Sequence, residues 1–381
     1  MKEQEVMIIG GGLAGLVNAI ILARAGFSVT LFEKKSYPRH KVCGEYISNE
    51  VKPLLQQIDA FPYDLKPVAI KRFSISSVNG KVAECDMPLG GFGISRYRLD
   101  EFLYNKALEA GANVEVNEEV RNVFFIDQHF RLELKSGQER QCQVLIGAHG
   151  KRSLMDHRLD RAFIKNKSPF LGLKMHYQAH WPEDLVSLHN FEGGYCGISR
   201  VEEGRVNFCF LIRQSAFRAH AGFQELENEL LLRNPQIQAF LAEAKPLFEK
   251  PLVISNISFA SKPLIEEHVL MCGDAAGMIH PLCGNGMAMA IQGAAFCSQQ
   301  VTAFLKGQID RATMEANYRQ QWQGAFRARL NFGRRVQKLF GHNLLSNAGV
   351  GILSKQPQLL RTLVRQSHRS PKNLKFSLEA C

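Results

Sequence analysis

The glycine cluster GGGLAG at residues 10–15 constrains this chain more than any other feature of its sequence. An apolar run at residues 6–9 precedes the cluster and reads as a short buried strand, and residues 16–25 follow it as an apolar helix. The apolar stretch is interrupted by four glycines and is preceded by Lys-Glu-Gln-Glu, so it is not expected to be a signal peptide or a membrane span. The pattern predicts a strand, a tight turn and a helix.

The spacing of the glycines indicates a dinucleotide site. Gly10 would permit the tight turn, Gly12 would let backbone N–H groups approach a pyrophosphate, and Gly15 would let the helix pack closely on the strand. A second strand is expected at residues 28–32 and ends at Glu33, 23 positions after Gly10, where a carboxylate suits the two hydroxyls of a ribose. The plainer alternative is a glycine turn without a ligand.

Length and charge narrow the class of protein. A chain of 381 residues corresponds to about two domains, or to one large α/β unit with an inserted sheet, and 45% hydrophobic residues exclude disordered and coiled-coil classes. The net charge is +11, but 12 Lys and Arg and a single acidic residue lie between residues 319 and 381. A local basic surface suits phosphates, anionic lipid or an acidic partner, and no nucleic-acid partner is expected.

The nine cysteines include no CxxC pair, and their number is odd. Reduced thiols of a cytoplasmic protein are the simplest interpretation, and neither a zinc site nor an iron–sulfur cluster is expected, so no metal ligands are assigned. The predicted location is the cytoplasm, with peripheral contact to the inner face of the membrane as an alternative.

A second glycine-rich region distinguishes between dinucleotides. GDAAG at residues 273–277 follows an apolar strand, and PLCGNGM at residues 281–287 precedes an apolar helix. Here the chain resembles FAD-dependent oxidoreductases of the para-hydroxybenzoate hydroxylase fold. The resemblance implies that Asp274 contacts the ribityl chain and that a helix beginning near Gly286 and Met287 points its N-terminus at the flavin ring, where it would stabilise the negative charge of a reduced flavin. The alternative is a helix turn capped by Asp274.

Two further segments resemble the same family. RYRLD at residues 96–100 is similar to its Arg-x-x-Leu-Asp segment, which implies that Arg96 reaches the cofactor. GAHG at residues 147–150 stands where the family carries Gly-Ala-Asp-Gly, a segment linked to the handling of FAD and NADPH. His149 replaces the aspartate here, and it either caps the turn or contacts the cofactor. NAD(P)H is one candidate electron donor.

The segment KVCG at residues 41–44 resembles the Lys-x-Cys-Gly segment of the geranylgeranyl reductase family. The resemblance implies a cysteine beside the flavin ring, which is Cys43. Cationic residues at positions 39–41 favour ionisation of this thiol, which would act as proton donor or nucleophile, with Glu45 as a nearby acid. The alternative is that Cys43 is a small residue that packs beneath the flavin.

The resemblance covers residues 1 to about 310. It implies an α/β fold with a Rossmann-type FAD-binding domain, a β-rich substrate domain and a helical C-terminal segment. The expected bounds are 1–75, 95–168 and 262–310 for FAD binding, 76–94 and 169–261 for the substrate domain, and 311–381 for the basic segment. The residues expected to bind FAD are Gly10, Gly12, Leu13, Ala14, Gly15, Glu33, Lys34, Lys41, Gly44, Arg96, Asp274, Gly284, Gly286 and Met287.

The substrate domain carries weaker signals. The isoprenoid reductase signature Tyr/Phe-x-Trp-x-Phe-Pro corresponds to residues 194–199, where its Trp and Pro are missing. The signature of flavin-dependent tryptophan halogenases is absent, because the chain has only two tryptophans, so halogenation is not expected. Strands are expected at residues 170–176, 177–180, 204–212 and 252–260, with a covering helix at 224–248.

The basic C-terminal segment contains an expected amphipathic helix. Its apolar residues recur at helical spacing, and its cations lie on another face. The helix could pack on the protein, rest on an anionic membrane, or receive a reductase or carrier-protein partner. The apolar residues are Trp322, Phe326, Leu330, Val336, Leu339 and Phe340, and the cations are Arg327, Arg334 and Lys338.

These observations predict an FAD-dependent oxidoreductase that acts on a lipophilic small molecule, by hydride transfer from reduced FAD to a carbon–carbon double bond. The first alternative is a flavin monooxygenase that hydroxylates an aromatic or polyketide substrate, and the second is a non-catalytic flavin- or lipid-binding protein. One fold hosts several of these chemistries, so the sequence leaves them open.

Overall fold

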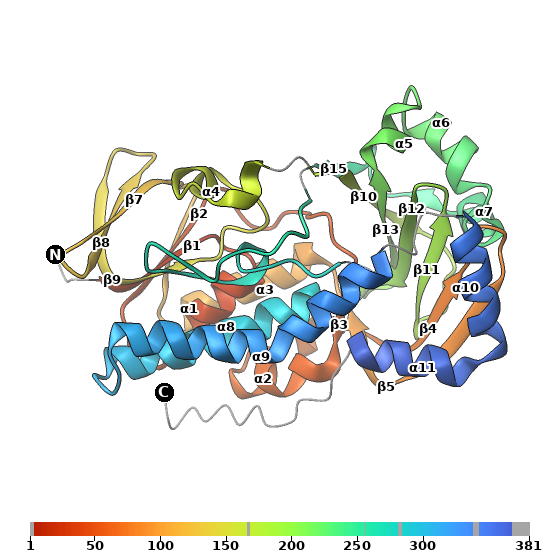
Figure 1. The fold of residues 1–381 in the computed structure, drawn as a ribbon. Helices are drawn as coiled ribbons and strands as arrows, with labels where there is room; N and C mark the ends of the chain where they lie inside the picture. Colours follow the sequence, from red (N-terminus) through yellow and green to blue (C-terminus); the bar gives the residue numbers. More distant parts are fainter. Residues whose placement is uncertain (1–3, 166–167, 256, 281–283, 338–342, 368–381) are drawn as a thin grey trace.

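Two β-sheets, one built around parallel strands and one almost entirely antiparallel, organise the chain (Figure 1). The computed structural model describes residues 4–165, 168–255, 257–280, 284–337 and 343–367. The predicted α/β class, with a Rossmann-type unit and a second sheet, is confirmed.

The first sheet has a parallel centre in the order β17, β9, β1, β2, β6. Its central strands are almost wholly buried, which is why they are apolar runs rather than alternating ones. The predicted strands at residues 6–9 and 28–32 are β1 and β2 within one or two residues. The strands are β1 (Gln4–Ile9), β2 (Val29–Glu33), β6 (Asn113–Val116), β7 (Val120–Ile126), β8 (His129–Leu134), β9 (Glu139–Gly147), β16 (Ile265–Glu266) and β17 (Val269–Met271).

Three helices pack against this sheet and against one another in a single apolar core: α1 (Leu13–Arg24), α3 (Arg96–Glu109) and α8 (Gly286–Leu305). The start of α8 at Gly286 agrees with the helix expected near Gly286 and Met287. Shorter helices are α2 (Lys52–Gln57), α4 (Leu154–Arg158) and α5 (Gln214–Arg218), and single helical turns occur at Asn49–Val51, Tyr63–Leu65, Ala162–Lys165, Glu202–Gly204 and Gly273–Ala275.

The second sheet runs in the order β14, β10, β13, β12, β11, β4, β5, β3, with β15 beside β10, and only the β11–β4 pair is parallel. It takes in residues 46–48 and 68–75, which the sequence analysis assigned to the first domain, because their strands hydrogen-bond to β5 and β11. The strands are β3 (Tyr46–Ser48), β4 (Val68–Ser76), β5 (Val82–Gly93), β10 (Phe170–Gln178), β11 (Leu185–Phe191), β12 (Gly194–Arg200), β13 (Arg205–Arg213), β14 (Lys245–Pro246) and β15 (Leu252–Ile254).

Three expectations for this region are wrong in detail. The two strands expected at 170–176 and 177–180 are one strand, β10, and the strand expected at 252–260 ends at Ile254. The helix expected at 224–248 is broken into α6 (Phe223–Leu226), a π-helical turn (Glu227–Leu231) and α7 (Pro235–Glu243). The break lies at Asn234, whose side chain accepts the Gln236 N–H and starts a new helix with proline at its first position.

The C-terminal segment forms α9 (Arg311–Gln337), α10 (Asn343–Lys355) and α11 (Pro357–Ser367). Trp322, Phe326 and Leu330 are buried in the core of the first sheet, so the packing interpretation is correct for this stripe of α9. Lys338, Leu339 and Phe340 lie outside the described residues, and the Val336 side chain is not described. No helix within the described ranges combines the length and apolarity of a membrane span.

One cation of α9 is buried. Arg329 is 5% exposed, and its two terminal nitrogens lie 2.9 and 2.8 Å from the carboxylate oxygens of Glu50, which is 2% exposed. This two-point ion pair fixes α9 against the helical turn that precedes α2.

We expect Arg329→Ala to lower the free energy of unfolding by about 3 to 5 kcal/mol, because it leaves the Glu50 carboxylate buried without a cation. Urea unfolding followed by circular dichroism measures the loss. Arg327→Ala is the matched control on the exposed face of the same helix, and it should change stability by less than about 0.5 kcal/mol. Equal effects of the two substitutions would contradict the assignment.

Candidate functional site

The sequence motifs meet at one edge of the first sheet. The carboxyl ends of neighbouring parallel strands lie together, so the turns after β1, β2, β9 and β17 are brought into one place. The turn after β1 is especially close to the turn after β9. A Cβ on Gly10 would lie 2.5 Å from the carbonyl oxygen of Ala148, and Gly10 has a φ of +104°.

The first turn of α1 forms a cradle. A Cβ on Gly15 would collide with the carbonyl oxygen of Gly10, which confirms the close packing predicted for Gly15. A Cβ on Gly12, by contrast, meets no described atom nearer than Nη2 of Arg96, at 4.0 Å. The space above Gly12 at a helix N-terminus, with a guanidinium at its margin, fits a pyrophosphate.

Glu33 is held in place at the end of β2. Its carboxylate accepts the N–H of Gly11 at 2.9 Å and the N–H of Lys35 at 3.1 Å, and it pairs with Arg39 at 2.9 Å. The carboxylate therefore sits beside the glycine turn, as a ribose-binding residue requires. The side chain of Lys34 is exposed.

Arg96 begins α3 and belongs to a buried charge cluster. Asp100 accepts from Arg96 at 2.6 and 2.8 Å and pairs with Lys41 at 2.6 Å. Burial alone would raise the pKa of Asp100, but the two cations hold it below its usual range. The cluster places the two predicted cofactor-binding cations, Arg96 and Lys41, side by side near the cradle.

The turn that contains Asp274 is fixed by Lys262, which the sequence analysis did not identify. The Lys262 ammonium donates to the carbonyl oxygens of Asp274 at 2.8 Å and Lys151 at 2.9 Å. Burial lowers the pKa of Lys262 to about 8. Gly273 packs against Ala14 of α1, where an added Cβ would lie 3.0 Å from the Ala14 side chain.

His149 lies in a buried network behind the same turn. Its Nε2 is 3.1 Å from Asp156, the acidic residue of the capping box that begins α4. Arg161 also donates to Asp156 and to the carbonyl oxygen of Ala275. Burial would raise the pKa of Asp156, but its bonds with His149 and Arg161 lower it to about 2. The capping interpretation of His149 thus has a structural basis, while contact with the cofactor stays a prediction.

Cys43 lies at the N-terminus of α8. Its thiol donates to the thioether sulfur of Met287 at 3.5 Å, although the two residues are 244 positions apart. Gly284 precedes the helix, has a φ of +60° and lies against the ring of Tyr46. The two segments that the family resemblance assigns to the flavin ring are therefore brought together.

The second sheet supports the segment that carries Cys43. His176, Asn207 and Ser199 are direct neighbours across β10, β13 and β12. Asn207 donates to the carbonyl oxygen of Cys43 at 3.2 Å, and Ser199 donates to that of Gly44 at 3.5 Å. These two hydrogen bonds hold the backbone of Cys43 and Gly44 against one face of the second sheet.

Glu45 is completely buried within this support. Its carboxylate accepts from the Lys174 ammonium, from Nε2 of His176 at 2.7 Å and from the backbone N–H of Arg96 at 2.7 Å. Burial would raise the pKa of Glu45, but Lys174 and His176 lower it below its usual range. Glu45 is therefore ionised at neutral pH, and its contacts position the segment rather than supply a proton.

The cations expected to ionise Cys43 are engaged elsewhere. Arg39 pairs with Glu33, and Lys41 pairs with Asp100. His40 packs among aromatic rings, and burial together with Lys174 and His176 lowers its pKa to about 4. Two other cations, Arg96 and Lys151, interact electrostatically with Cys43.

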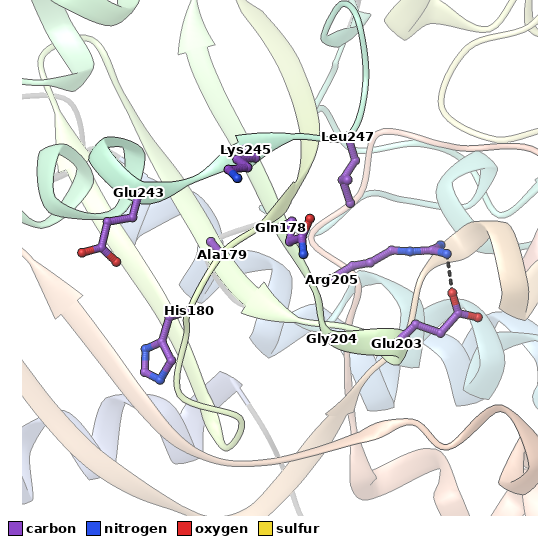
Figure 2. Close-up of a pocket in the computed structure, with 9 residues that line it drawn as sticks. All are labelled: Gln178, Ala179, His180, Glu203, Gly204, Arg205, Glu243, Lys245 and Leu247. Atoms are coloured by element: carbon purple, nitrogen blue, oxygen red, sulfur yellow. Dashed lines mark hydrogen bonds and ion pairs between the residues drawn. The ribbon is translucent and has the colours of Figure 1, made fainter.

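A pocket of about 630 Å³ opens elsewhere, at the outer edge of the second sheet (Figure 2). An ion pair between Arg205 and Glu203 borders it, and Lys245 and Glu243 lie on the opposite side. No residue that the sequence analysis assigned to the cofactor lines this pocket. Over the described ranges, no group of three or more His, Cys, Asp or Glu has the arrangement of a metal site.

The fold and the site have the features of a dinucleotide-binding enzyme: a glycine cradle, a buried carboxylate at the end of β2 and a helix N-terminus all converge at the carboxyl edge of a Rossmann-type sheet. The family comparison agrees. Residues 3–323 match the FAD binding domain model, so the chain belongs to this family, and it is an FAD-dependent enzyme.

The relatives carry out different reactions. Digeranylgeranylglycerophospholipid reductase 2 of Methanopyrus kandleri is 25% identical over 93% of this chain and 90% of that protein. Tryptophan 2-halogenase of Chondromyces crocatus is 23% identical over 85% of this chain, which spans only 66% of the halogenase. The structure of PqsL, a probable FAD-dependent monooxygenase from Pseudomonas aeruginosa, has a TM-score of 0.73 at 17% identity and covers 92% of this chain and 100% of that one.

We expect Gly12→Val to fold normally but to purify without yellow colour, with bound flavin at roughly a tenth of the wild-type amount or less. The added side chain would enter the space above Gly12, where it displaces no described atom but blocks the pyrophosphate. Absorbance at the flavin maximum measures the loss, and circular dichroism measures folding. Gly324→Val, on the exposed side of α9, is the control that should stay yellow.

We expect Lys174→Met to destabilise the protein by about 3 kcal/mol or more, because Glu45 would stay buried without its cation. The double variant Lys174→Met with Glu45→Gln removes that unpaired charge and should recover most of the loss. Urea unfolding of both variants and of Glu45→Gln alone completes the cycle. A double variant no more stable than Lys174→Met would refute the ion pair as the cause.

Proposed function

We propose that this enzyme reduces a carbon–carbon double bond of a lipophilic small molecule. Bound FAD, reduced by NAD(P)H or by a separate reductase protein, would supply the hydride to one alkene carbon. The Cys43 thiol donates a proton to the other alkene carbon and recovers it from solvent. The observation that carries the proposal is the position of Cys43 at the N-terminus of α8.

The geometry of the site supports the following roles for the residues that would hold the cofactor. The N-terminus of α1 with Gly12 receives the pyrophosphate, and Arg96 and Lys41 add positive charge beside it. Glu33 binds ribose, and Asp274 meets the ribityl chain, with Lys262 holding its turn in place. The N-terminus of α8 at Gly286 and Met287 faces the ring.

Glu45 has a positioning role in this proposal. An ionised carboxylate held by Lys174, His176 and a backbone N–H is a poor proton donor at neutral pH. Its negative charge fixes Lys174 and His176 beneath the segment of Cys43. Cys43, which is partly exposed and points to Met287, is the better proton donor.

The match to the reductase of M. kandleri supports reduction over halogenation, because it extends over nearly the whole of both chains. A partly exposed thiol also has a use in alkene reduction that it lacks in hydroxylation, where the oxygen atom comes from dioxygen. Hydroxylation of an aromatic or polyketide ring is the second candidate, and the likeness in fold to PqsL favours it.

Anaerobic stopped-flow spectroscopy separates the two reactions. The enzyme is reduced with NADPH, or with dithionite if NADPH fails, and is then mixed with oxygenated buffer or with geranylgeraniol in detergent. Slow reoxidation by oxygen and fast reoxidation by the isoprenoid would support the reductase. A transient flavin–oxygen adduct with no response to the isoprenoid would replace it with the hydroxylase.

We expect Cys43→Ala to retain FAD but to slow reoxidation by the unsaturated lipid by about 100-fold, because the proton donor is lost. Cys209→Ala is the matched control. Cys209 lies on the same face of the second sheet as Asn207, which holds the Cys43 segment, and burial raises the pKa of the Cys209 thiol to about 12. Equal rates for wild type and Cys43→Ala would leave Cys43 with a packing role only.

A further inference from the structure

Helix α10 carries apolar residues on both its inward and its outward face, with its two asparagines on a polar side between them. Ser346, Val350 and Leu353 form the face that packs inward, with Val350 3% exposed. The only charged residue among its 13 positions is Lys355, at its end. A second apolar face on a helix is normally buried in a core, in an interface or in lipid, because exposed apolar surface is costly in water.

Among the residues that the structure describes, none covers the outward face of α10. Leu344 is 86% exposed, Leu345 50% and Ile352 55%. At 100° per residue these three side chains, together with the exposed Ala348, fall within an arc of about 100°. The arc is therefore a continuous apolar stripe and not a set of scattered surface leucines.

The charged residues of α10 and α11 are all cations, one of which is paired with an acidic residue of β5. Residues 343–367, which form α10 and α11, contain Lys355, Arg361 and Arg365 and no acidic residue. Arg361 pairs with Asp86 of β5 at 2.6 Å, and the Lys81 ammonium lies 3.8 Å from the Cβ position of Gly351. A helix pair with an apolar stripe and positive flanks complements an anionic lipid surface.

The inward face of α10 connects this stripe to the candidate active site. Val350 and Leu360 share a core cluster with Leu188, Tyr195 and Leu211 of the second sheet. Leu211 lies four residues along β13 from Asn207, which supports Cys43, so both side chains are on one face of the sheet, about 13 Å apart. The apolar layer beneath α10 is thus continuous with the support of the active-site segment.

We infer that α10 and α11 dock this enzyme on an anionic membrane surface, with Leu344, Leu345 and Ile352 inserted among the lipids. The two helices lie at the opposite end of the molecule from the β7–β8 hairpin (Figure 1). The inference rests on the proposed function only in its reason for docking, since a lipophilic substrate is held in lipid. In the basic C-terminal segment, α10 and α11 thus take the membrane-binding role that the sequence analysis considered for α9, because the apolar stripe of α9 is buried.

Vesicle sedimentation with the FAD-loaded enzyme tests the inference. We expect binding to vesicles of phosphatidylglycerol and phosphatidylcholine, weakened by salt, and little binding to phosphatidylcholine alone. Substitution of Leu344, Leu345 and Ile352 by Ser should weaken binding about tenfold or more while flavin content is unchanged. The matched control is Ser at Ile126, Leu247 and Val253, which are similarly exposed but lie on other elements, and it should bind as wild type.

Three results would overturn the inference. These are no sedimentation with either vesicle, equal loss of binding in the two triple variants, and a dimer in solution that the α10 variant converts to a monomer. The last result would assign the stripe to a second copy of the chain. Sedimentation is measured without turnover, so an enzyme that binds vesicles but does not respond to geranylgeraniol would refute the proposed function alone.

Discussion

The position of the candidate active site depends on one buried carboxylate, that of Glu45. Removing a carboxylate from water is costly, and only several good partners offset the loss. Here the partners come from both halves of the molecule, because Lys174 and His176 belong to the second sheet and the N–H of Arg96 begins a helix that packs on the first sheet core. The carboxylate therefore joins the two sheets immediately beside Cys43.

Buried ion pairs of this kind contribute more to geometry than to net stability. A well-packed apolar replacement is often as stable as a buried pair, but it has no directional bonds and so would not fix the residues around it. Arg329 with Glu50 and Lys41 with Asp100 follow the same rule at two other places where distant segments meet. All three pairs use a carboxylate that is at most 2% exposed. The arrangement is consistent with a cofactor site that must be rigid before the cofactor binds.

The sequence predicted what depends on local chain geometry. The strand, turn and helix at the N-terminus and the start of α8 were identified because glycine spacing and apolar runs are local signals. Lys174, Asn207 and Ser199 were missed, because their contacts depend on strand register between segments far apart in the chain. The alternation in β10 does place residues 174 and 176 on one face, but nothing local pairs that face with Glu45. The break before α7 had a local signal in Asn234-Pro235, which the apolar pattern of residues 224–248 obscured.

One face of the second sheet both supports the Cys43 segment and contributes to the apolar cluster beneath α10 and α11. Strand geometry explains how one face does both. Direct neighbours in antiparallel strands share a face, and every second residue along a strand returns to it. Along β13 this face presents Asn207 beneath the Cys43 segment, then Cys209, then Leu211 in the apolar cluster that α10 and α11 cover. Lys174 of β10 stands directly opposite Cys209, so the buried Lys174–Glu45 pair lies at the end of this face that supports Cys43. The apolar cluster lies toward α10, and the polarity of the face therefore rises along β13 from Leu211 to Asn207.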